Sequence, residues 1–163
     1  PIRTLPIISI SVNSFGVIVS FIFFLICSLS FGLLSWSIIL LPILLILIFI
    51  FLIGIGWIFS VIGIFFKDLK EILTIFFSFI IYLTPVVINQ NMVNGFYWNI
   101  IMLNPFSHFI VCFRDLYYYQ FHFTSWLVLL LISLISFFLG LWLINKTEHI
   151  IGQFIWTKVV KVN

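Results

Sequence analysis

The chain has 163 residues, of which 64% are hydrophobic and only 7% are charged, and its mean hydropathy is +1.39. A soluble domain carries roughly 25% charged residues, so this composition excludes an ordinary soluble fold and predicts a polytopic membrane protein, an all-α transmembrane helical bundle. The formal net charge of +3 is small and dispersed, and it offers no basic surface for nucleic acid. The chain begins at Pro1 without a cleavable signal pattern, and we expect it to be a fragment of a longer protein.

Four apolar runs are predicted to cross the membrane. The first is residues 7–31, and small or polar residues follow helical spacing along one of its faces: Ser9, Asn13, Gly16, Ser20 and Cys27. This face serves either close packing against another helix or a polar stripe along a path for substrate. The second run, 38–66, is about 43 Å long as a helix and must tilt, kink or extend past the interface, because the hydrocarbon core is ~30 Å thick. The third and fourth runs are residues 72–88, close to the minimum crossing length, and 127–144.

The only dense charge cluster lies between the second and third runs, where we predict a loop or short surface helix outside the membrane. It consists of Lys67, Asp68, Leu69, Lys70 and Glu71. Four crossings place most basic residues on one side: Arg3, Lys67, Lys70, Lys146, Lys158 and Lys161. Only Arg114 falls on the other side. An excess of Lys and Arg marks cytoplasmic connections, so this side and the C-terminus are predicted to be cytoplasmic.

Residues 96–119 are predicted to form two short helices that make an outward re-entrant hairpin. Asn104 and Pro105 indicate the start of the second helix, because Asn can cap a helix and Pro fits its first turn. The residues that follow divide into two faces at helical spacing. The apolar face contains Phe106, Phe109, Ile110, Phe113, Leu116 and Tyr117. The polar face contains Ser107, His108, Cys112, Arg114, Asp115, Tyr118 and Tyr119.

Two features of this hairpin each have two interpretations. Arg114 and Asp115 form either a local interfacial ion pair that holds the hairpin, which we favour, or a contact for an anionic or hydroxylated substrate. Tyr117, Tyr118 and Tyr119 form either part of an interfacial aromatic belt or a sliding surface for a glycan, because both uses rely on rings with an apolar body and a polar tip.

The sequence predicts no catalytic, cofactor-binding or metal site. No pair of acidic residues or histidines has catalytic or metal-ligand spacing, and no glycine-rich loop ends in Lys-Ser or Lys-Thr to bind ATP. The predicted spans carry no ionisable group of the kind that ion-coupled transporters use. Cys27 and Cys112 each stand alone in apolar sequence and are expected to pack as small hydrophobes. Any energy source must therefore come from a partner.

Three stretches together resemble the type-2 ABC exporter permeases, and most closely the branch that exports O-antigen, capsule and teichoic acid. The family pattern is an aromatic-Arg-Asp-Leu loop, a span ending in Ser-Pro or Thr-Pro, then Leu-Asn-Pro and Phe-Arg. The matching residues are Phe66, Lys67, Asp68 and Leu69, with Lys in place of Arg, then Thr84 and Pro85, then Leu103, Asn104, Pro105, Phe113, Arg114 and Asp115. Residues 1–163 would then be the C-terminal part of a single transmembrane domain, with the last four of its six spans.

The resemblance implies a multi-pass, homodimeric permease in the plasma (inner) membrane of a bacterium, surrounded by membrane lipid. Two copies of a separate cytoplasmic ABC ATPase subunit would drive it, so ATP would be used by the partner and no cofactor by this chain. The loop Lys67, Asp68, Leu69, Lys70 and Glu71 would contact the ATPase. The outer gate and substrate path would include Asn104, Pro105, Arg114, Asp115, Tyr117, Tyr118 and Tyr119.

The function expected from this resemblance is export of a lipid-linked polysaccharide, such as a lipopolysaccharide O-antigen. Three alternatives stay open. The chain is a type-2 ABC permease for a drug, lipid, peptide or other small amphiphile, a membrane-embedded transferase with essential carboxylates, or a structural subunit without a transport path.

Overall fold

The computed structural model describes residues 4–30, 36–66, 68–86, 88, 90–117 and 121–160, without the side chains of residues 5, 14, 24 and 148–160. Over these ranges the regular structure is entirely helical, which confirms the predicted all-α class. The elements are α1 (Thr4–Ser30), the 3₁₀ helix η1 (Trp36–Leu40), α2 (Leu41–Phe65), α3 (Leu69–Tyr82), the 3₁₀ helix η2 (Gln90–Met92), α4 (Gly95–Met102), α5 (Pro105–Asp115) and α6 (Phe123–Val160).

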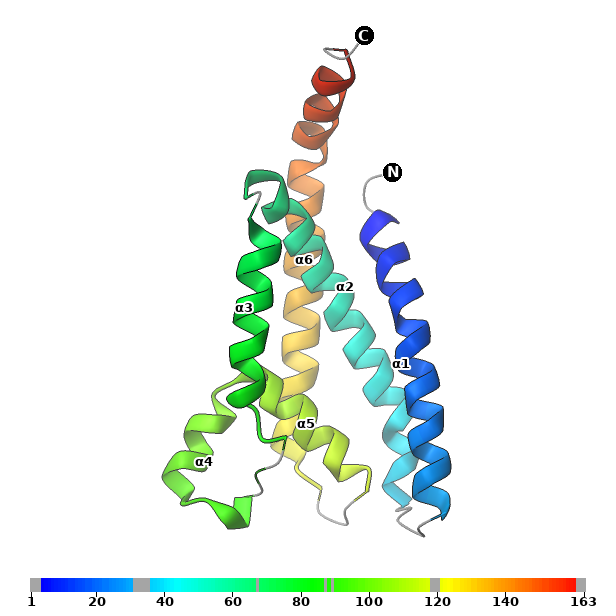
Figure 1. Ribbon diagram of the computed structural model, residues 1–163, viewed down its shortest axis with the longest axis vertical. Helices are drawn as coiled ribbons and strands as arrows, with labels where there is room; N and C mark the ends of the chain where they lie inside the picture. Colours follow the sequence, from blue (N-terminus) through cyan, green and yellow to red (C-terminus); the bar gives the residue numbers. More distant parts are fainter. Residues whose placement is uncertain are drawn as a thin grey trace.

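Successive long helices run up and down along one axis (Figure 1). The beginning of α1, the connection between α2 and α3 and the C-terminal half of α6 lie toward one end (Figure 1). The short helices α4 and α5 lie at the opposite end, together with the beginning of α6 (Figure 1). The charged connection and the α4–α5 pair are therefore separated by the length of the bundle.

Among the described residues, three helical segments are long and apolar enough to cross a membrane: Pro6–Ser30, Trp36–Phe65 and Phe123–Thr147. They correspond to the first, second and fourth predicted runs. The fourth helix is longer than predicted, since α6 continues beyond residue 144 to Val160. Hydrophobic length thus located these three helices well, although it did not give their ends.

The third predicted run, 72–88, forms a shorter helix than expected. Helix α3 ends at Tyr82 and has 14 residues, which is roughly 21 Å of helix, less than the ~30 Å hydrocarbon core. Pro85 explains the early end, because proline disfavours helical backbone in the residue before it and cannot donate a helical hydrogen bond. The continuous helical crossing predicted here is therefore absent from the described residues.

Helices α2 and α6 form the most extensive helix pair, and they approach most closely at two glycines. A Cβ on Gly54 would overlap the backbone of Ser136 and Phe137, and a Cβ on Gly140 would overlap the backbone of Gly54. Beside this crossing, Trp57, Val61 and Ile144 form a buried cluster. The pair α2–α6 is the structural frame of the chain, because small residues allow the two backbones to touch.

Helices α1 and α3 pack much less. Helix α3 has no buried residue, and α1 contacts mainly α2. Most of the small-residue face predicted for the first run does not pack against another described helix. Ser9, Asn13 and Ser20 are exposed and a Cβ on Gly16 would meet nothing within 4 Å, whereas Cys27 is half-buried. Both helices therefore expose broad apolar surfaces.

Candidate functional site at the α5 junction

Helix α5 begins at the residues that the sequence indicated. Asn104 Oδ1 accepts a hydrogen bond from the backbone N–H of Phe106 at 3.1 Å, and Pro105 occupies the first turn. Asn is a favoured cap because its side chain satisfies a free N–H, and proline at this position loses no helical bond. The other side of the same amide, Asn104 Nδ2, donates to the Leu83 carbonyl at 3.4 Å.

Helices α4 and α5 form a sharply bent pair, with an angle of 106° between them. Two side chains of α5 hold the end of α4. Ser107 Oγ donates to the Ile101 carbonyl at 2.6 Å, and His108 Nε2 lies 3.0 Å from the Met102 carbonyl. These carbonyls belong to the last turn of α4, and the Ile101 carbonyl also accepts from the backbone N–H of Asn104 at 3.2 Å. Hydrogen bonds from these two side chains to backbone carbonyls of α4 therefore hold the bend.

The polar face of α5 is turned into the protein. Ser107, Cys112 and Asp115 are buried, and α5 packs mainly against α6. Cys112 and Leu116 share a core cluster with Leu44 and Leu129. Both sides of α5 therefore pack inward: the polar side through Ser107, Cys112 and Asp115, and the apolar side through the fully buried Leu116.

The aromatic face of α5 contacts one ring from each of the three preceding long helices. The ring pairs, with centroid distances, are Phe113 with Phe21 of α1 (5.5 Å), Phe109 with Phe51 of α2 (4.9 Å), Phe106 with Phe51 (6.1 Å) and Phe106 with Phe77 of α3 (6.1 Å). Edge-to-face rings at these distances are favourable. Helix α5 therefore connects α1, α2 and α3 on one side with α6 on the other.

Arg114 binds the backbone that follows α3. Its Nη1 donates to the Ile88 carbonyl at 2.9 Å, and its Nη2 donates to the Val86 carbonyl at 3.0 Å and to the Pro85 carbonyl. These carbonyls lie beyond the last helical turn of α3, so they have no helical donors. The planar guanidinium suits them, because its N–H groups diverge in a fixed fork.

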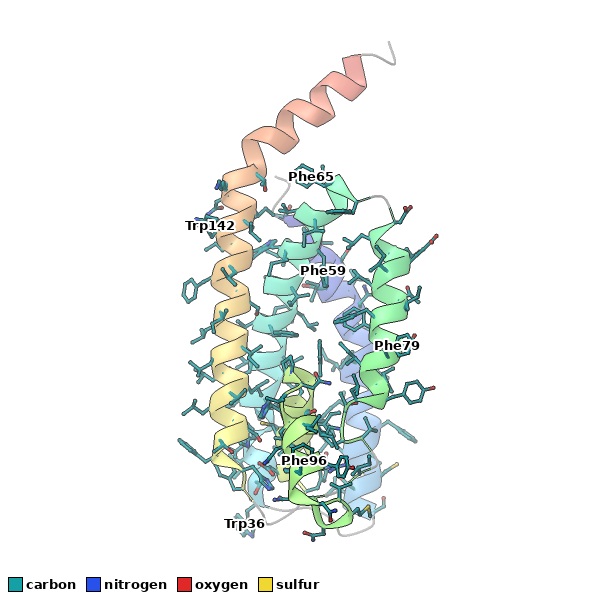
Figure 2. The ribbon with its side chains drawn as sticks, turned by 90° about the vertical axis from the view of Figure 1, so that its left-hand side faces the viewer. Trp36, Phe59, Phe65, Phe79, Phe96 and Trp142 are labelled. Carbon is teal, nitrogen blue, oxygen red and sulfur yellow. The ribbon has the colours of Figure 1, made fainter. Side chains whose placement is uncertain are left out.

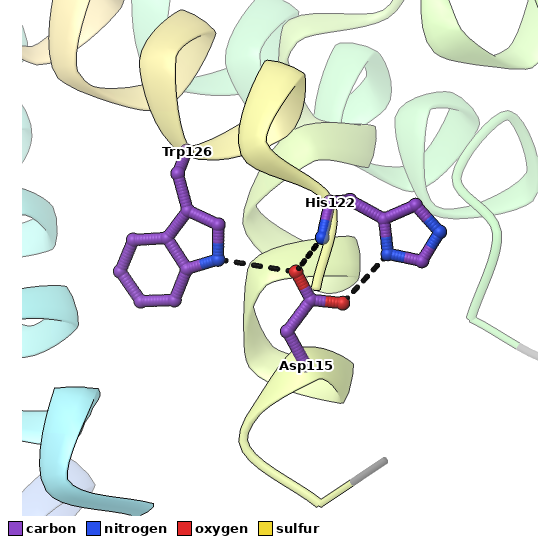
Figure 3. A network of polar contacts seen from close by, with 3 residues as sticks. All are labelled: Asp115, His122 and Trp126. Atoms are coloured by element: carbon purple, nitrogen blue, oxygen red, sulfur yellow. Dashed lines mark hydrogen bonds and ion pairs between the residues drawn. The ribbon is translucent and has the colours of Figure 1, made fainter. Parts of the chain in front are cut away.

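Asp115 binds the first turn of α6 (Figure 3). Its Oδ2 accepts from the backbone N–H of His122 at 2.8 Å and from Trp126 Nε1 at 3.1 Å, and its Oδ1 lies 2.7 Å from His122 Nδ1. The carboxylate is only 2% exposed. A buried carboxylate is costly unless donors surround it, and the N-terminal end of a helix adds a favourable dipole.

The prediction of a local ion pair between Arg114 and Asp115 is therefore wrong. The two consecutive side chains diverge, and Asp115 pairs with His122 instead. Both still hold the α4–α5 pair, Arg114 through the backbone that follows α3 and Asp115 through the start of α6. Sequence reasoning missed His122 and Trp126, and the signal that pointed to them was a lone carboxylate in apolar sequence, which requires nearby donors.

The charged connection lies at the far end of the bundle. Phe65 marks this end, and Trp36 and Phe96 mark the end with α4 and α5 (Figure 2). Asp68, Lys70 and Glu71 are exposed and Leu69 is half-buried. Lys67 lies outside the described residues.

The remaining predicted gate residues are only partly described. Pro105 is exposed, and Asn104, Arg114 and Tyr117 are half-buried. Tyr118 and Tyr119 lie outside the described residues, so the two interpretations of the tyrosine run stay open. Within the described residues, no group of three His, Cys, Asp or Glu side chains gathers as metal ligands would. Comparison with known protein families and with curated proteins finds no match for this chain.

Proposed function

We propose that this chain is a transmembrane permease subunit of an ATP-driven exporter that moves a lipid-linked polysaccharide across a bacterial plasma membrane. The observation that carries the proposal is the contact between two separate motifs of the resemblance. The segment after Thr84 and Pro85 is bound by Arg114, and Asn104 reaches the carbonyl of Leu83. Residues that carry a family resemblance together are expected to form one structural unit, and these do.

The proposal includes four crossings and a re-entrant hairpin. Helix α3 is too short to cross alone, and we propose that residues 83–88 complete its crossing. Non-helical backbone is tolerated at membrane depth only where its polar groups find partners within the protein. The side chains of Arg114 and Asn104 supply donors to four carbonyls of this segment: Leu83, Pro85, Val86 and Ile88.

The distribution of charge supports a cytoplasmic position for the α2–α3 connection. Lys70 and Lys146 lie toward one end in this topology, and Arg114 toward the other. Lys146 Nζ lies 5.0 Å from the centre of the Trp142 ring. Trp with a neighbouring Lys is typical of a membrane interface. The exposed cluster Asp68, Lys70 and Glu71 is then available to a cytoplasmic ATPase, and a second copy of the permease would complete the channel.

The aromatic content of the chain supports a glycan over other cargo. Flat rings stack on sugar faces, and aromatic residues make up 20% of the sequence. A permease for a smaller amphiphile is the second candidate. The broad exposed apolar surfaces of α1 and α3 favour it, because a membrane-dissolved cargo would approach through them.

The test is deletion of the full-length gene, followed by measurement of lipid-linked glycan on each side of the plasma membrane. We expect glycan to accumulate on the cytoplasmic side and surface glycan to disappear, with recovery when the wild-type gene is returned. Normal surface glycan without a trapped intermediate would reject polysaccharide export and leave the small-amphiphile permease. Alanine substitutions at Asp68, Asp115 and Glu148 test the transferase alternative. A transferase would lose its activity when an essential carboxylate is removed, while ATP hydrolysis by the partner would stay coupled to export.

A further inference from the structure

Helix α3 is the long helix least attached to the frame. It contains no buried residue and makes only a small contact with α2. In contrast, α2 and α6 touch backbone to backbone at Gly54 and Gly140. A helix with few buried contacts is displaced at lower cost than one in a packed pair. In the part of the chain that the structure describes, α3 therefore makes little contact with the α2–α6 frame.

Both ends of α3 are connected to features that matter for the proposed exporter. Its first turn contains the exposed Lys70 and Glu71 and is preceded by the exposed Asp68. Its last turn leads directly into the carbonyls that Arg114 and Asn104 bind, and Phe77 contacts Phe106 of α5. The helix therefore links the charged connection with the α4–α5 pair through one continuous stretch of chain.

Asp115, the residue after Arg114, fixes the end of α5 to a different helix. Asp115 holds the first turn of α6 through three donors, and α6 belongs to the frame. Two adjacent side chains at the end of α5 thus have different anchors. Arg114 is attached to the connection that directly follows the loosely packed helix α3, and Asp115 is attached to the start of α6.

We propose that Arg114 is a positioning residue that joins α3 to the α4–α5 pair, and that Asp115 holds the same point of α5 to α6. Displacement of the Asp68–Glu71 connection then moves residues 83–88, and Arg114 carries this movement to α5. The acceptors are backbone carbonyls, so the contact depends on the shape of the guanidinium fork rather than on its charge alone. The link to ATP-driven movement rests on the proposed function, whereas the joint between α3 and α5 does not.

The joint is tested by distance measurements between spin labels on the full-length protein in lipid nanodiscs, with Cys27 and Cys112 replaced by alanine. Tyr82 at the end of α3 and Leu103 between α4 and α5 are suitable positions, because they are 85% and 82% exposed. We expect one narrow distance distribution in the parent protein and a clearly broader one in Arg114→Gln and Arg114→Lys. Asp115→Asn is the matched control and should instead broaden the distance between Leu103 and Phe123. An unchanged Tyr82–Leu103 distribution in both Arg114 variants would overturn the joint.

A second measurement separates positioning from general damage. In vesicles that contain the full complex, we expect Arg114→Gln to lower export per ATP hydrolysed by roughly 5-fold or more, as for a lost coupling between sites. Protein abundance and ATP hydrolysis should stay near wild-type values. Arg114→Lys, which keeps the charge but not the fork, should not restore export. Full export by Arg114→Lys, or equal losses of hydrolysis and export, would overturn the positioning role. If no glycan is exported even by the wild type, the proposed function fails while the distance measurement still decides the joint.

Discussion

Gly54 of α2 and Gly140 of α6 lie against each other where these helices cross, with no room for a methyl group on either. The atoms that a Cβ would meet are backbone atoms of the opposite helix. Backbone cannot swing aside as the end of a long side chain can. The crossing therefore fixes the separation of the two helices that hold the rest of the chain.

Alanine at either glycine should separate α2 from α6 and destabilise the protein. Inserting a methyl into a packed interface costs about 1–3 kcal/mol, which outweighs the better helix propensity of alanine. Thermal unfolding of the full-length protein in detergent measures the effect. Gly16→Ala is the control, because a Cβ there meets nothing within 4 Å. Equal melting temperatures for Gly54→Ala and Gly16→Ala would show that the helices do not touch at Gly54.

Asp115→Asn should destabilise the beginning of α6. The amide cannot accept from all three donors with the strength of a carboxylate, and hydrogen bonds to charged groups contribute roughly 1.5–3 kcal/mol. Trp126→Phe should cost less, because it removes a single donor to Asp115. Hydrogen exchange of the amides in the first turns of α6 measures the local loss. Asp68→Asn is the control, since Asp68 is exposed and makes no side-chain cap bond. An equal rise in hydrogen exchange in Asp115→Asn and Asp68→Asn would show that the Asp115 network does not stabilise the start of α6.

The sequence predicted the long helices because apolar length is a local property. It also predicted the start of α5 at Asn104, since capping depends on neighbours two residues apart. The length of the helix in the third run was overestimated, because hydropathy does not register that Pro85 ends a helix within an apolar stretch. The inward position of the polar face of α5 could not be predicted. That position depends on donors from His122 and Trp126 and on carbonyls after α3, which approach only when the chain folds.

Asn104→Ala should weaken α5, whereas Asn94→Ala should leave α4 unchanged. Both asparagines precede a short helix, but only Asn104 makes a side-chain cap bond. Loss of such a bond costs about 1 kcal/mol, and Asn104 also loses its contact with Leu83. Thermal unfolding of the two variants gives a direct comparison within one protein. A larger loss at Asn94 than at Asn104 would contradict the caps described for these helices.

Cysteine labelling should place Lys70 and Met92 on opposite sides of the membrane. Lys70 lies at the start of α3 and Met92 lies in η2, so this pair flanks the proposed third crossing. Lys70→Cys and Met92→Cys are well suited because both positions are exposed. With Cys27 replaced by alanine, a membrane-impermeant maleimide should label Lys70→Cys only in inside-out vesicles and Met92→Cys only in right-side-out vesicles. Cys112 is fully buried and serves as the internal control, which should react in neither preparation. Labelling of both positions from one side would mean that α3 does not cross, and the hairpin of α4 and α5 would then share a side with the charged connection and could not be an outer gate.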